Sequence, residues 1–401
     1  MRVTLAYGSG SCLSFRGSLE FGTARQDPRG LTGSEYGFLR IAEELAAMGH
    51  DVTAHTVTSE APGEHRGIKL RAIDAPIEPC DVMVSLNEPD ALRLAPAGTF
   101  RACLYWVNDL TGVRAGIGDI VDLWLSPSNS HLEQFRTNPA WHRVQVSPTN
   151  PLGAETFVFD EAKWTVVPLG CDPRNLVAGY DEGDRLHTHL DGQPYWNKVP
   201  GKVVYSSSPD RGLHWLLQEW PAIKAAVPHA TLSIFYRLAP WLRGFDSTPH
   251  YPPIEPLRSR ANYIEECLVR FAERGGMGVT VRDSVSRDVI EREMASAEVF
   301  AYPMQTTTWS EGFSCSTLEA CAARACPITT DCDAFGDVYG ETLPLTKIEG
   351  DWVPKWRDTV IKALTDAAFR DGVNEKARKL GERLTWRRTA EELCKAIEAK
   401  R

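Results

Sequence analysis

VFAYPMQTTTWSEGFSCSTLEA, residues 299–320, joins a strand-like run to a helix start that carries two carboxylates. The strand-like part is Val299–Pro303, and a second strand-like run, Pro327–Thr330, comes shortly afterwards. This order predicts a βα connection at the carboxyl end of a strand, which is where open α/β sheets bind ligands. Glu311 and Glu319 lie within the connection, eight residues apart.

The two carboxylates and the helix start predict a site for polyols and phosphates. Carboxylates can accept hydrogen bonds from sugar or ribose hydroxyls, and the N–H groups of residues 312–316 can hold a diphosphate or orient a sugar. Glu319 has a structural alternative, because Ser316-x-x-Glu319 also matches a capping box in which Glu319 only bonds back to the helix start. Glu311 has no such alternative.

Length and composition limit the class of protein. The 401 residues are enough for two domains, each with its own core. The formal net charge of −9 argues against nucleic acid or an anionic membrane as the main partner, so any membrane contact would be peripheral. No apolar run reaches transmembrane length. Ten cysteines without paired spacing, and a start that lacks a signal-peptide core, predict a cytoplasmic location.

Two rounds of alternating strand and helix signals predict two α/β domains, at 1–180 and 201–375. The first domain opens with the strand Arg2–Tyr7 and continues with a loop, 8–31, that is long enough to bind a ligand. A helix then begins with the capping-box pattern Thr32-x-x-Glu35. Further strands of this domain are expected at Val52–Val57, Asp81–Leu86, Arg101–Trp106 and Leu123–Ser126.

A polar stretch at 181–200 is interpreted as the linker between the domains. The last segment, 376–401, is expected to be an amphipathic helix. Strands of the second domain are expected at Lys202–Ser206, Ala230–Tyr236, Val279–Val281 and Val299–Pro303, and helices at Gly212–Ala226, Ile264–Arg274 and Arg287–Ala297.

A positively charged residue, Arg211, lies at one predicted helix start. Ser208-Pro-Asp-Arg211-Gly predicts a helix with Ser208 as the N-cap and Pro209 in the first position. Arg211 would then lie in the first turn, where a positive side chain opposes the helix dipole. Its charge would be offset by an ion pair with Asp210 or another carboxylate, or by a bound diphosphate.

Two groups of residues were considered as metal ligands. Asp331-Cys-Asp333 could hold Mg²⁺ or Mn²⁺ between phosphates, but it comes late, after the strand that follows Glu319, so a solvated turn is preferred. Zinc would need close cysteine pairs, and no Cys-x₂-Cys spacing occurs among Cys315, Cys321, Cys326 and Cys332. We therefore expect neither a metal nor a cofactor.

Taken in order, the motifs resemble those of GT-B glycosyltransferases of the retaining family 4 type. The resemblance extends along nearly the whole chain, and the Glu311-x₇-Glu319 region is its most specific part. The other matching segments are Gly30–Glu35, Gly49–Thr53, Val167–Asp172, Ser207–Leu213, Ile234–Tyr236 and Val285–Ser286.

The resemblance implies an α/β fold of two Rossmann-like domains facing across a cleft, with a carboxy-terminal helix that returns to the first domain. The nucleoside diphosphate sugar would be bound mainly by the second domain and the acceptor by the first. Glu319 would bind ribose hydroxyls, while Arg211 and Glu311 would be catalytic, on the diphosphate and on the transferring sugar. Donor contacts are implied for Gly33, Val285, Gly312, Phe313, Ser314 and Cys315, and acceptor-side positions for Asn108 and Asp109.

Three positions depart from the family pattern. The arginine expected five residues before Arg211 is Ser206, for which Arg237 is a candidate substitute. A glycine usual before the next strand is Arg324. A histidine that many relatives have after a strand of the first domain is replaced by the segment Tyr105–Asp109.

The resemblance predicts retaining transfer of a sugar from a UDP- or GDP-linked donor to a hydroxyl of a glycan or glycoconjugate. Two alternatives stay open. One is a sugar-nucleotide epimerase or hydrolase of similar fold. The other is a catalytically silent nucleotide-sugar binder, which Ser206, Arg324 and Asn108 suggest.

Overall fold

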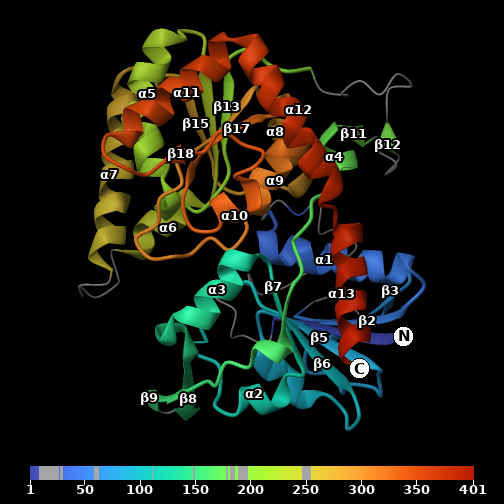
Figure 1. The fold of residues 1–401 in the computed structure, drawn as a ribbon. Coiled ribbons are helices and arrows are strands. Elements are labelled where there is room, and N and C mark those ends of the chain that lie inside the picture. Colours follow the sequence, from blue (N-terminus) through green and yellow to red (C-terminus); the bar gives the residue numbers. More distant parts are fainter. Residues whose placement is uncertain are drawn as a thin grey trace. The chain divides into compact units, whose positions relative to one another are not determined.

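The computed structural model describes residues 1–8, 27, 30–57, 63–110, 112–147, 150–177, 179–180, 186–187, 197–245 and 254–401. The chain divides into two compact units (Figure 1). Unit 1 comprises Met1–Ala24, Leu31–Gly170 and Leu384–Arg401, and unit 2 comprises Arg25–Gly30 and Cys171–Arg383. The change of unit after Gly170 comes before the predicted boundary at 180. Most of the predicted linker, 181–185 and 188–196, lies outside the described residues, as does most of the predicted 8–31 loop.

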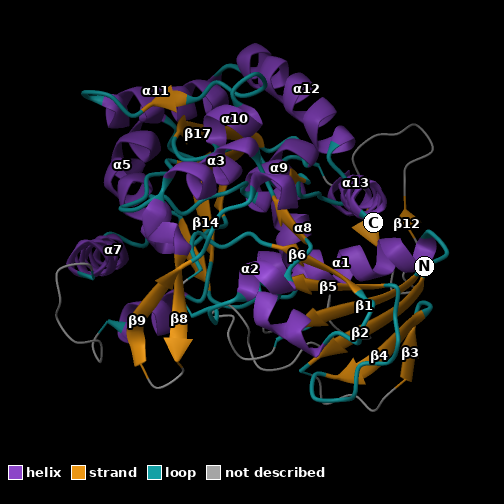
Figure 2. Cartoon of the chain, turned by 60° about the horizontal axis from the view of Figure 1, so that its bottom comes forward, coloured by secondary structure: helices purple, strands orange, loops and turns teal. Residues whose placement is uncertain are grey.

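Unit 1 contains an eight-stranded sheet in the order β10-β7-β6-β5-β1-β2-β4-β3. All neighbouring strands are parallel except β3 and β4, which form an antiparallel edge (Figure 2). The strands are β1 (Arg2–Tyr7), β2 (Asp51–Thr56), β3 (Gly63–His65), β4 (Ile68–Ala72), β5 (Val82–Leu86), β6 (Phe100–Leu104), β7 (Leu123–Ser126) and β10 (Trp164–Val166). A separate antiparallel pair is formed by β8 (Arg143–Ser147) and β9 (Asn150–Thr156).

The first helix of unit 1 begins as the sequence predicts. Thr32 Oγ1 accepts the N–H of Glu35 at 3.2 Å, and the Glu35 carboxylate accepts the N–H of Thr32 at 2.6 Å, which confirms the capping box. The helices of unit 1 are α1 (Gly33–Ala47), α2 (Ile117–Ile120), α3 (Asn129–Thr137) and α13 (Trp386–Lys400), with 3₁₀ turns η2 (Pro89–Leu94), η3 (Pro139–His142) and η4 (Glu161–Lys163).

Helix α13 completes unit 1 although it is made of the last residues of the sequence. It packs on α1, where a Cβ on Gly37 would come within 3.0 Å of the Trp386 ring. A Cβ on Gly170 would lie 2.3 Å from the carbonyl carbon of Thr385, so only glycine permits this approach. Buried Trp386 and Leu393 anchor the helix. The returning helix predicted from the resemblance is confirmed, and it begins after Thr385.

Unit 2 contains a six-stranded parallel sheet in the order β15-β14-β13-β16-β17-β18. Its strands are β13 (Lys202–Tyr205), β14 (Thr231–Phe235), β15 (Val279–Arg282), β16 (Val299–Tyr302), β17 (Cys326–Asp331) and β18 (Thr346–Lys347). A short antiparallel pair, β11 (Gly179–Tyr180) and β12 (Leu186–His187), also belongs to this unit.

Helices cover the sheet of unit 2. Helix α5 packs against α7 and α11, and α9 packs against α8 and α12 on the other side of the sheet (Figure 1). The helices are α4 (Pro173–Val177), α5 (Leu213–Ala226), α6 (Leu238–Gly244), α7 (Glu255–Glu273), α8 (Arg287–Ser296), α9 (Cys315–Ala322), α10 (Phe335–Tyr339), α11 (Trp352–Thr365) and α12 (Ala367–Arg383), with the 3₁₀ turn η5 (Pro209–Arg211).

Candidate functional site

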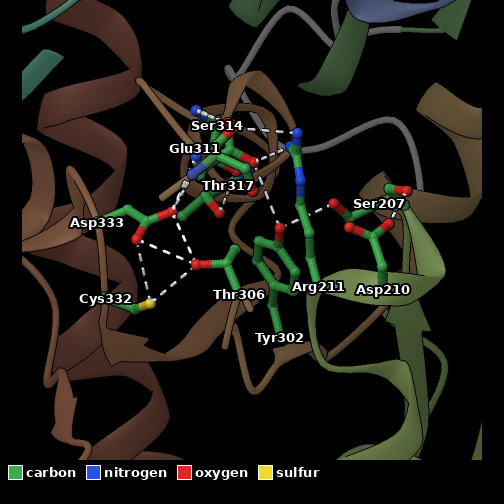
Figure 3. A network of polar contacts seen from close by, with 12 residues as sticks. Ser207, Asp210, Arg211, Tyr302, Thr306, Glu311, Ser314, Thr317, Cys332 and Asp333 are labelled. Atoms are coloured by element: carbon green, nitrogen blue, oxygen red, sulfur yellow. Dashed lines mark hydrogen bonds and ion pairs between the residues drawn. The ribbon is translucent and has the colours of Figure 1, made fainter. Parts of the chain in front are cut away.

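Three connections of unit 2 meet at the carboxyl edge of its sheet. They follow β13, β16 and β17, and these three strands are neighbours in the sheet. Parallel strands end at the same edge, so residues that are distant in the sequence come together there. Figure 3 shows the polar network that results.

Arg211 and Glu311 are joined by an ion pair in this network. Arg211 Nη1 donates to Glu311 Oε2 at 2.6 Å, and Nη2 donates to the carbonyl of Ser310 at 3.1 Å. Glu311 is 9% exposed, and the Arg211 side chain is partly exposed. Burial opposes the charge of Arg211, but the nearby Glu311 carboxylate raises its pKa further above the ordinary value. The cation and the carboxylate predicted from the sequence therefore belong to one site.

The local setting of Arg211 differs from the prediction. Ser208 starts only the 3₁₀ turn η5, and its side chain bonds to Asp210 rather than capping backbone N–H groups. The α-helix α5 starts after Gly212, whose φ of +109° ends the turn. The first-turn position predicted for Arg211 is therefore wrong, because a left-handed glycine separates it from the helix. The unfavourable interaction between Arg211 and the helix dipole, from which a bound anion was predicted, is therefore absent.

Tyr302, the last residue of β16, contacts the carboxylate of this ion pair. Its hydroxyl donates to Glu311 Oε2 at 3.4 Å and lies 2.8 Å from Ser207 Oγ. Burial, followed by the negative charge of Glu311, raises the pKa of Tyr302 well above its ordinary value. The hydroxyl therefore stays protonated and can act as a donor to the carboxylate.

Ser314 forms the start of helix α9. Its backbone is left-handed, with φ +69°, and its hydroxyl accepts the N–H of Thr317 at 3.4 Å. Its N–H was expected to face a ligand, but it donates to Glu311 Oε1 at 3.0 Å. Left-handed backbone at a non-glycine residue is strained and is concentrated at functional sites. The same turn contains Gly312 and Phe313, which are buried, and Cys315, the first residue of the helix.

Glu319 is held by a buried arginine and not by a helix cap. The cap of α9 is Ser314, so the capping-box alternative that placed the cap at Ser316 is wrong. Glu319 Oε1 accepts a hydrogen bond from Arg287 Nη2, and Arg287 Nε donates to Glu291 at 3.1 Å. All three ion-paired residues are at most 6% exposed. One buried guanidinium of α8 thus holds two carboxylates, one of which is on α9.

Asp333 supports the segment that carries Glu311. Its Oδ2 accepts the N–H groups of Ser310 at 2.8 Å and Glu311 at 2.9 Å, and Thr306 Oγ1 donates to the same carboxylate at 3.2 Å. The preferred interpretation of Asp331-Cys-Asp333 as a solvated turn is therefore wrong for Asp333. Asp331 is exposed, as that interpretation expects, but it is the last residue of β17 and not part of a turn.

A comparison with protein-family models matches residues 256–366 to the model described as glycosyl transferases group 1. This match includes both glutamates, Arg287 and Asp333. Residues 256–366 therefore match a group 1 glycosyltransferase domain, and the two-unit α/β fold is that of GT-B glycosyltransferases. The enzyme class predicted from the sequence, a glycosyltransferase, is thereby confirmed, and the retaining family 4 type stays a prediction.

Solved structures agree with the glycosyltransferase fold over nearly the whole chain. AviGT4, a glycosyltransferase of avilamycin A biosynthesis, superposes with a TM-score of 0.62 at 15% identity, over 99% of this chain and 97% of that one. Sucrose-phosphate synthase from Thermosynechococcus elongatus gives 0.62 at 13% identity, over 99% and 98%. The Anabaena protein HepE, in complex with UDP and glucose, gives 0.59 at 11% identity, over all of both chains. A comparison with curated protein sequences finds no match.

The remaining predicted residues of the glycosyltransferase are placed as follows. Val285 precedes α8, and a Cβ on Gly30 would lie 2.4 Å from its carbonyl oxygen, within unit 2. In unit 1, Gly33 is the first residue of α1, and Asn108 and Asp109 follow β6. Nothing lies within 4 Å of a Cβ on Gly33, so packing within the described residues does not demand glycine there.

Hydrogen bonds organise the loop of unit 1 that follows β6 and contains Asn108. Asn87 Oδ1 accepts the N–H of Trp106 at 2.7 Å, and Asn87 Nδ2 lies 3.5 Å from Ser34 Oγ in the first turn of α1. His131 Nε2 lies 2.9 Å from the carbonyl oxygen of Val107, and burial lowers the pKa of His131 to about 4. A neutral histidine therefore supports the loop that contains Asn108.

Arg324, one of the departures from the family pattern, has a structural explanation. It follows the end of α9 with φ +53°. The N–H of Ala325 donates to Ala320 O at 2.9 Å and that of Arg324 to Cys321 O at 3.2 Å, the bonds of a Schellman motif. Glycine is favoured at this position because of its backbone freedom. The arginine therefore alters a helix end and not the network around Glu311.

Sequence reasoning missed Arg287, Asp333 and Tyr302 as parts of the site. Asp333 was considered only as a metal ligand, because its position beside the Glu311 loop depends on β17 lying next to β16 in the sheet. Arg287 was noted only as the start of a helix. Among the residues that the structure describes, no three His, Cys, Asp or Glu side chains converge as metal ligands. No described helix is long and apolar enough to cross a membrane.

Proposed function

We propose that the protein is a retaining glycosyltransferase that moves a sugar from a nucleoside diphosphate sugar, linked to UDP or GDP, to an acceptor hydroxyl of a glycan or glycoconjugate. The observation that carries the proposal is the pairing of Arg211 with Glu311 beside the start of α9, the helix that also carries Glu319. A diphosphate needs a cation, and sugar and ribose hydroxyls need carboxylates.

Each charged group has a distinct role in the proposal. Arg211 exchanges part of its contact with Glu311 for the phosphate oxygens, which its planar guanidinium can bind in pairs. Glu311 is then available to the hydroxyls of the transferring sugar. Glu319, whose position is set by Arg287, accepts hydrogen bonds from the ribose.

The barrier to transfer lies mainly in charge separation. As the glycosidic bond breaks, negative charge grows on the departing diphosphate and positive charge on the sugar ring. Arg211 and the N–H groups at the start of α9 stabilise the first of these, because they are oriented before the reaction begins. The departing phosphate takes the proton of the acceptor hydroxyl on the same face of the sugar, so the configuration is kept and no protein nucleophile is required.

The nature of the donor is supported by a structural relative, since HepE binds UDP and glucose. Acceptor binding is assigned to unit 1, at the loop that contains Asn108 and Asp109. We assign no metal and no cofactor to the reaction. The nine cysteines in the described part of the chain are unpaired, which supports a reducing compartment such as the cytoplasm.

A thermal-shift panel tests the proposal. UDP, GDP, ADP and their common sugar conjugates are added one at a time, and selective binding raises the unfolding temperature by mass action. We expect either UDP and a UDP-linked sugar, or GDP and a GDP-linked sugar, to raise the unfolding temperature. If none of the ligands raises the unfolding temperature, the proposal is contradicted.

Product analysis with the selected donor then distinguishes the alternatives. A transferase needs an acceptor for efficient turnover and gives a product of unchanged anomeric configuration. An epimerase alters the donor alone, a hydrolase releases free sugar, and a silent binder gives no product.

A further inference from the structure

We propose that Asp333 is a positioning residue that sets Glu311 for the sugar part of the donor and has no part in holding the nucleotide. The inference rests on the proposed function, because it assigns the sugar to Glu311 and the ribose to Glu319. It gives a role to Asp333, one of the two carboxylates of the Asp331-Cys-Asp333 segment that was considered above as a metal site.

The geometry that points to this role is a set of converging hydrogen bonds. One oxygen of Asp333, Oδ2, receives the N–H groups of Ser310 and Glu311 at 2.8 and 2.9 Å. Thr306 Oγ1 lies 3.2 Å from each carboxylate oxygen of Asp333. The N–H of Ala334 donates to the carbonyl oxygen of Glu311 at 3.2 Å. Both backbone polar groups of Glu311 are therefore bound by the connection that follows β17.

This support matters because Glu311 lies in an irregular loop. The segment from Pro303 to Phe313 lies between β16 and the N-cap of α9, so no helix or strand ladder pairs its backbone groups. Figure 3 shows Asp333 and Arg211 on opposite sides of Glu311, the first reaching its backbone and the second its carboxylate. Unpaired buried N–H groups are rare in folded proteins, and the Asp333 carboxylate supplies their acceptor.

The backbone of Asp333 is itself unusual. Its φ is +51°, in the left-handed region that aspartate adopts more readily than most residues. The left-handed turn follows β17, where Asp331 is exposed and bonds to none of the loop residues by any contact that the structure describes. The two carboxylates of the Asp331-Cys-Asp333 segment thus differ in their surroundings, because Asp331 is exposed and Asp333 accepts hydrogen bonds from the Glu311 loop. A shared metal would need both, whereas positioning needs only Asp333.

The effect should be confined to the sugar. Glu319 is held by Arg287, on α8, and takes no part in the hydrogen bonds of Asp333. Loss of the Asp333 carboxylate would loosen Glu311 and leave the ribose contact in place. A residue with only a general structural role would weaken both parts of the donor alike.

The test compares Asp333→Ala and Asp333→Asn with the matched control Asp331→Ala. Amide hydrogen exchange of the ligand-free proteins comes first. We expect faster exchange at Ser310 and Glu311 in Asp333→Ala, partial protection in Asp333→Asn and no change in Asp331→Ala. Unchanged exchange in Asp333→Ala would overturn the positioning role. Asp333→Asn keeps an acceptor oxygen, so it carries the test if the alanine variant fails to fold.

Calorimetric titration then uses UDP with UDP-glucose and GDP with GDP-mannose. We expect Asp333→Ala to weaken binding of the sugar nucleotide by roughly 10-fold or more. Its affinity for the nucleoside diphosphate alone should stay within about twofold, as for an independent site. Equal losses for both ligands, or equal losses in Asp331→Ala, would overturn the inference. If the wild-type protein binds none of the four, the proposed function fails, and hydrogen exchange still decides the role of Asp333.

Discussion

Glu311 and Glu319 both lie in the connection between β16 and β17, but different contacts hold their side chains. Glu311 lies in a loop, and its support comes from three other segments, through Arg211, Tyr302 and Asp333. Glu319 lies in the second turn of α9, and its described partner is the buried Arg287 of α8.

This difference shows how one βα connection can serve two parts of a ligand. A carboxylate on a helix, paired with a buried arginine, is fixed in place before any ligand arrives. A carboxylate on a loop, balanced between an arginine and a hydroxyl, can exchange partners as charge develops. In the proposed function, the first carboxylate would hold the nucleotide, the constant part of the donor, and the second would contact the sugar, the part that reacts.

Arg211→Ala should have the largest effect. Negative charge on the departing diphosphate grows as the bond breaks, so loss of Arg211 should lower kcat by about 100-fold to 1,000-fold. Arg211→Lys should retain part of the rate, because a point charge remains without the planar fork. Steady-state kinetics with the donor selected by thermal shift measures both.

Arg237→Ala is the matched control for that experiment. Arg237 is an exposed cation that follows the neighbouring strand β14. We expect it to leave kcat unchanged. Normal turnover in Arg211→Ala with a loss in Arg237→Ala would move the phosphate role to Arg237 and leave Arg211 as an ion-pair residue.

Glu319→Ala should have the next largest effect and should change two properties. Removing one partner of a buried ion pair costs about 3 kcal/mol or more in the free energy of unfolding. Donor affinity should also fall, since the ribose contact is lost in ground and transition states alike. Chemical denaturation and calorimetry measure these separately, and Glu319→Gln should recover part of the affinity.

The triple variant Glu319→Ala, Arg287→Met, Glu291→Leu separates the two effects. It removes the buried arginine together with both of its carboxylate partners, so stability should return while donor affinity stays low. If the triple variant binds donor like the wild-type protein, Glu319 has only a structural role.

Arg324→Gly should have a small effect of the opposite sign. The left-handed backbone costs a non-glycine residue about 1 kcal/mol, part of which is offset by the greater freedom of glycine in the unfolded chain. We expect the free energy of unfolding to rise by about 0.5 kcal/mol, with unchanged kinetics. A clear gain in kcat would show that this departure from the family limits catalysis.

Chelation should have the smallest effect of all. Since Arg211 is the proposed partner of the diphosphate and Asp333 is occupied by backbone N–H groups, EDTA should leave turnover unchanged. The assay compares rates with EDTA, with added Mg²⁺ and with added Mn²⁺. Full loss in EDTA that either metal restores would return the Asp331-Cys-Asp333 segment to consideration as a metal site.

Much of the fold follows from local sequence patterns. The predicted strands Arg2–Tyr7 and Leu123–Ser126 have the observed bounds, and the capping box at Thr32 is present. These features depend on periodicity and caps that lie within a few residues. The strands β3 and β4 near one edge of the sheet and the pair of β8 and β9 were missed, because their signals are short and mixed with polar residues.

The site could be predicted only in part, for a related reason. The spacing of Glu311 and Glu319 identified the connection, but their partners depend on strand order. Arg287 is 32 residues before Glu319, and Asp333 is 22 residues after Glu311. Nothing local in the sequence shows that β17 lies beside β16 or that α8 lies beside α9. The helix start assigned to Ser208 failed for a different reason, since Gly212 interrupts the turn.

The position of α13 affects how the protein can fold while it is being made. Unit 1 needs the segment Leu384–Arg401, which the ribosome completes only after the whole of Cys171–Arg383. Until then the surface of α1 around Gly37 lacks the ring of Trp386. Domains usually finish folding in the order of synthesis. Here the unit that is synthesised second is the first that can be completed, and a nascent chain would expose the apolar face of unit 1 until residues 384–401 have been synthesised.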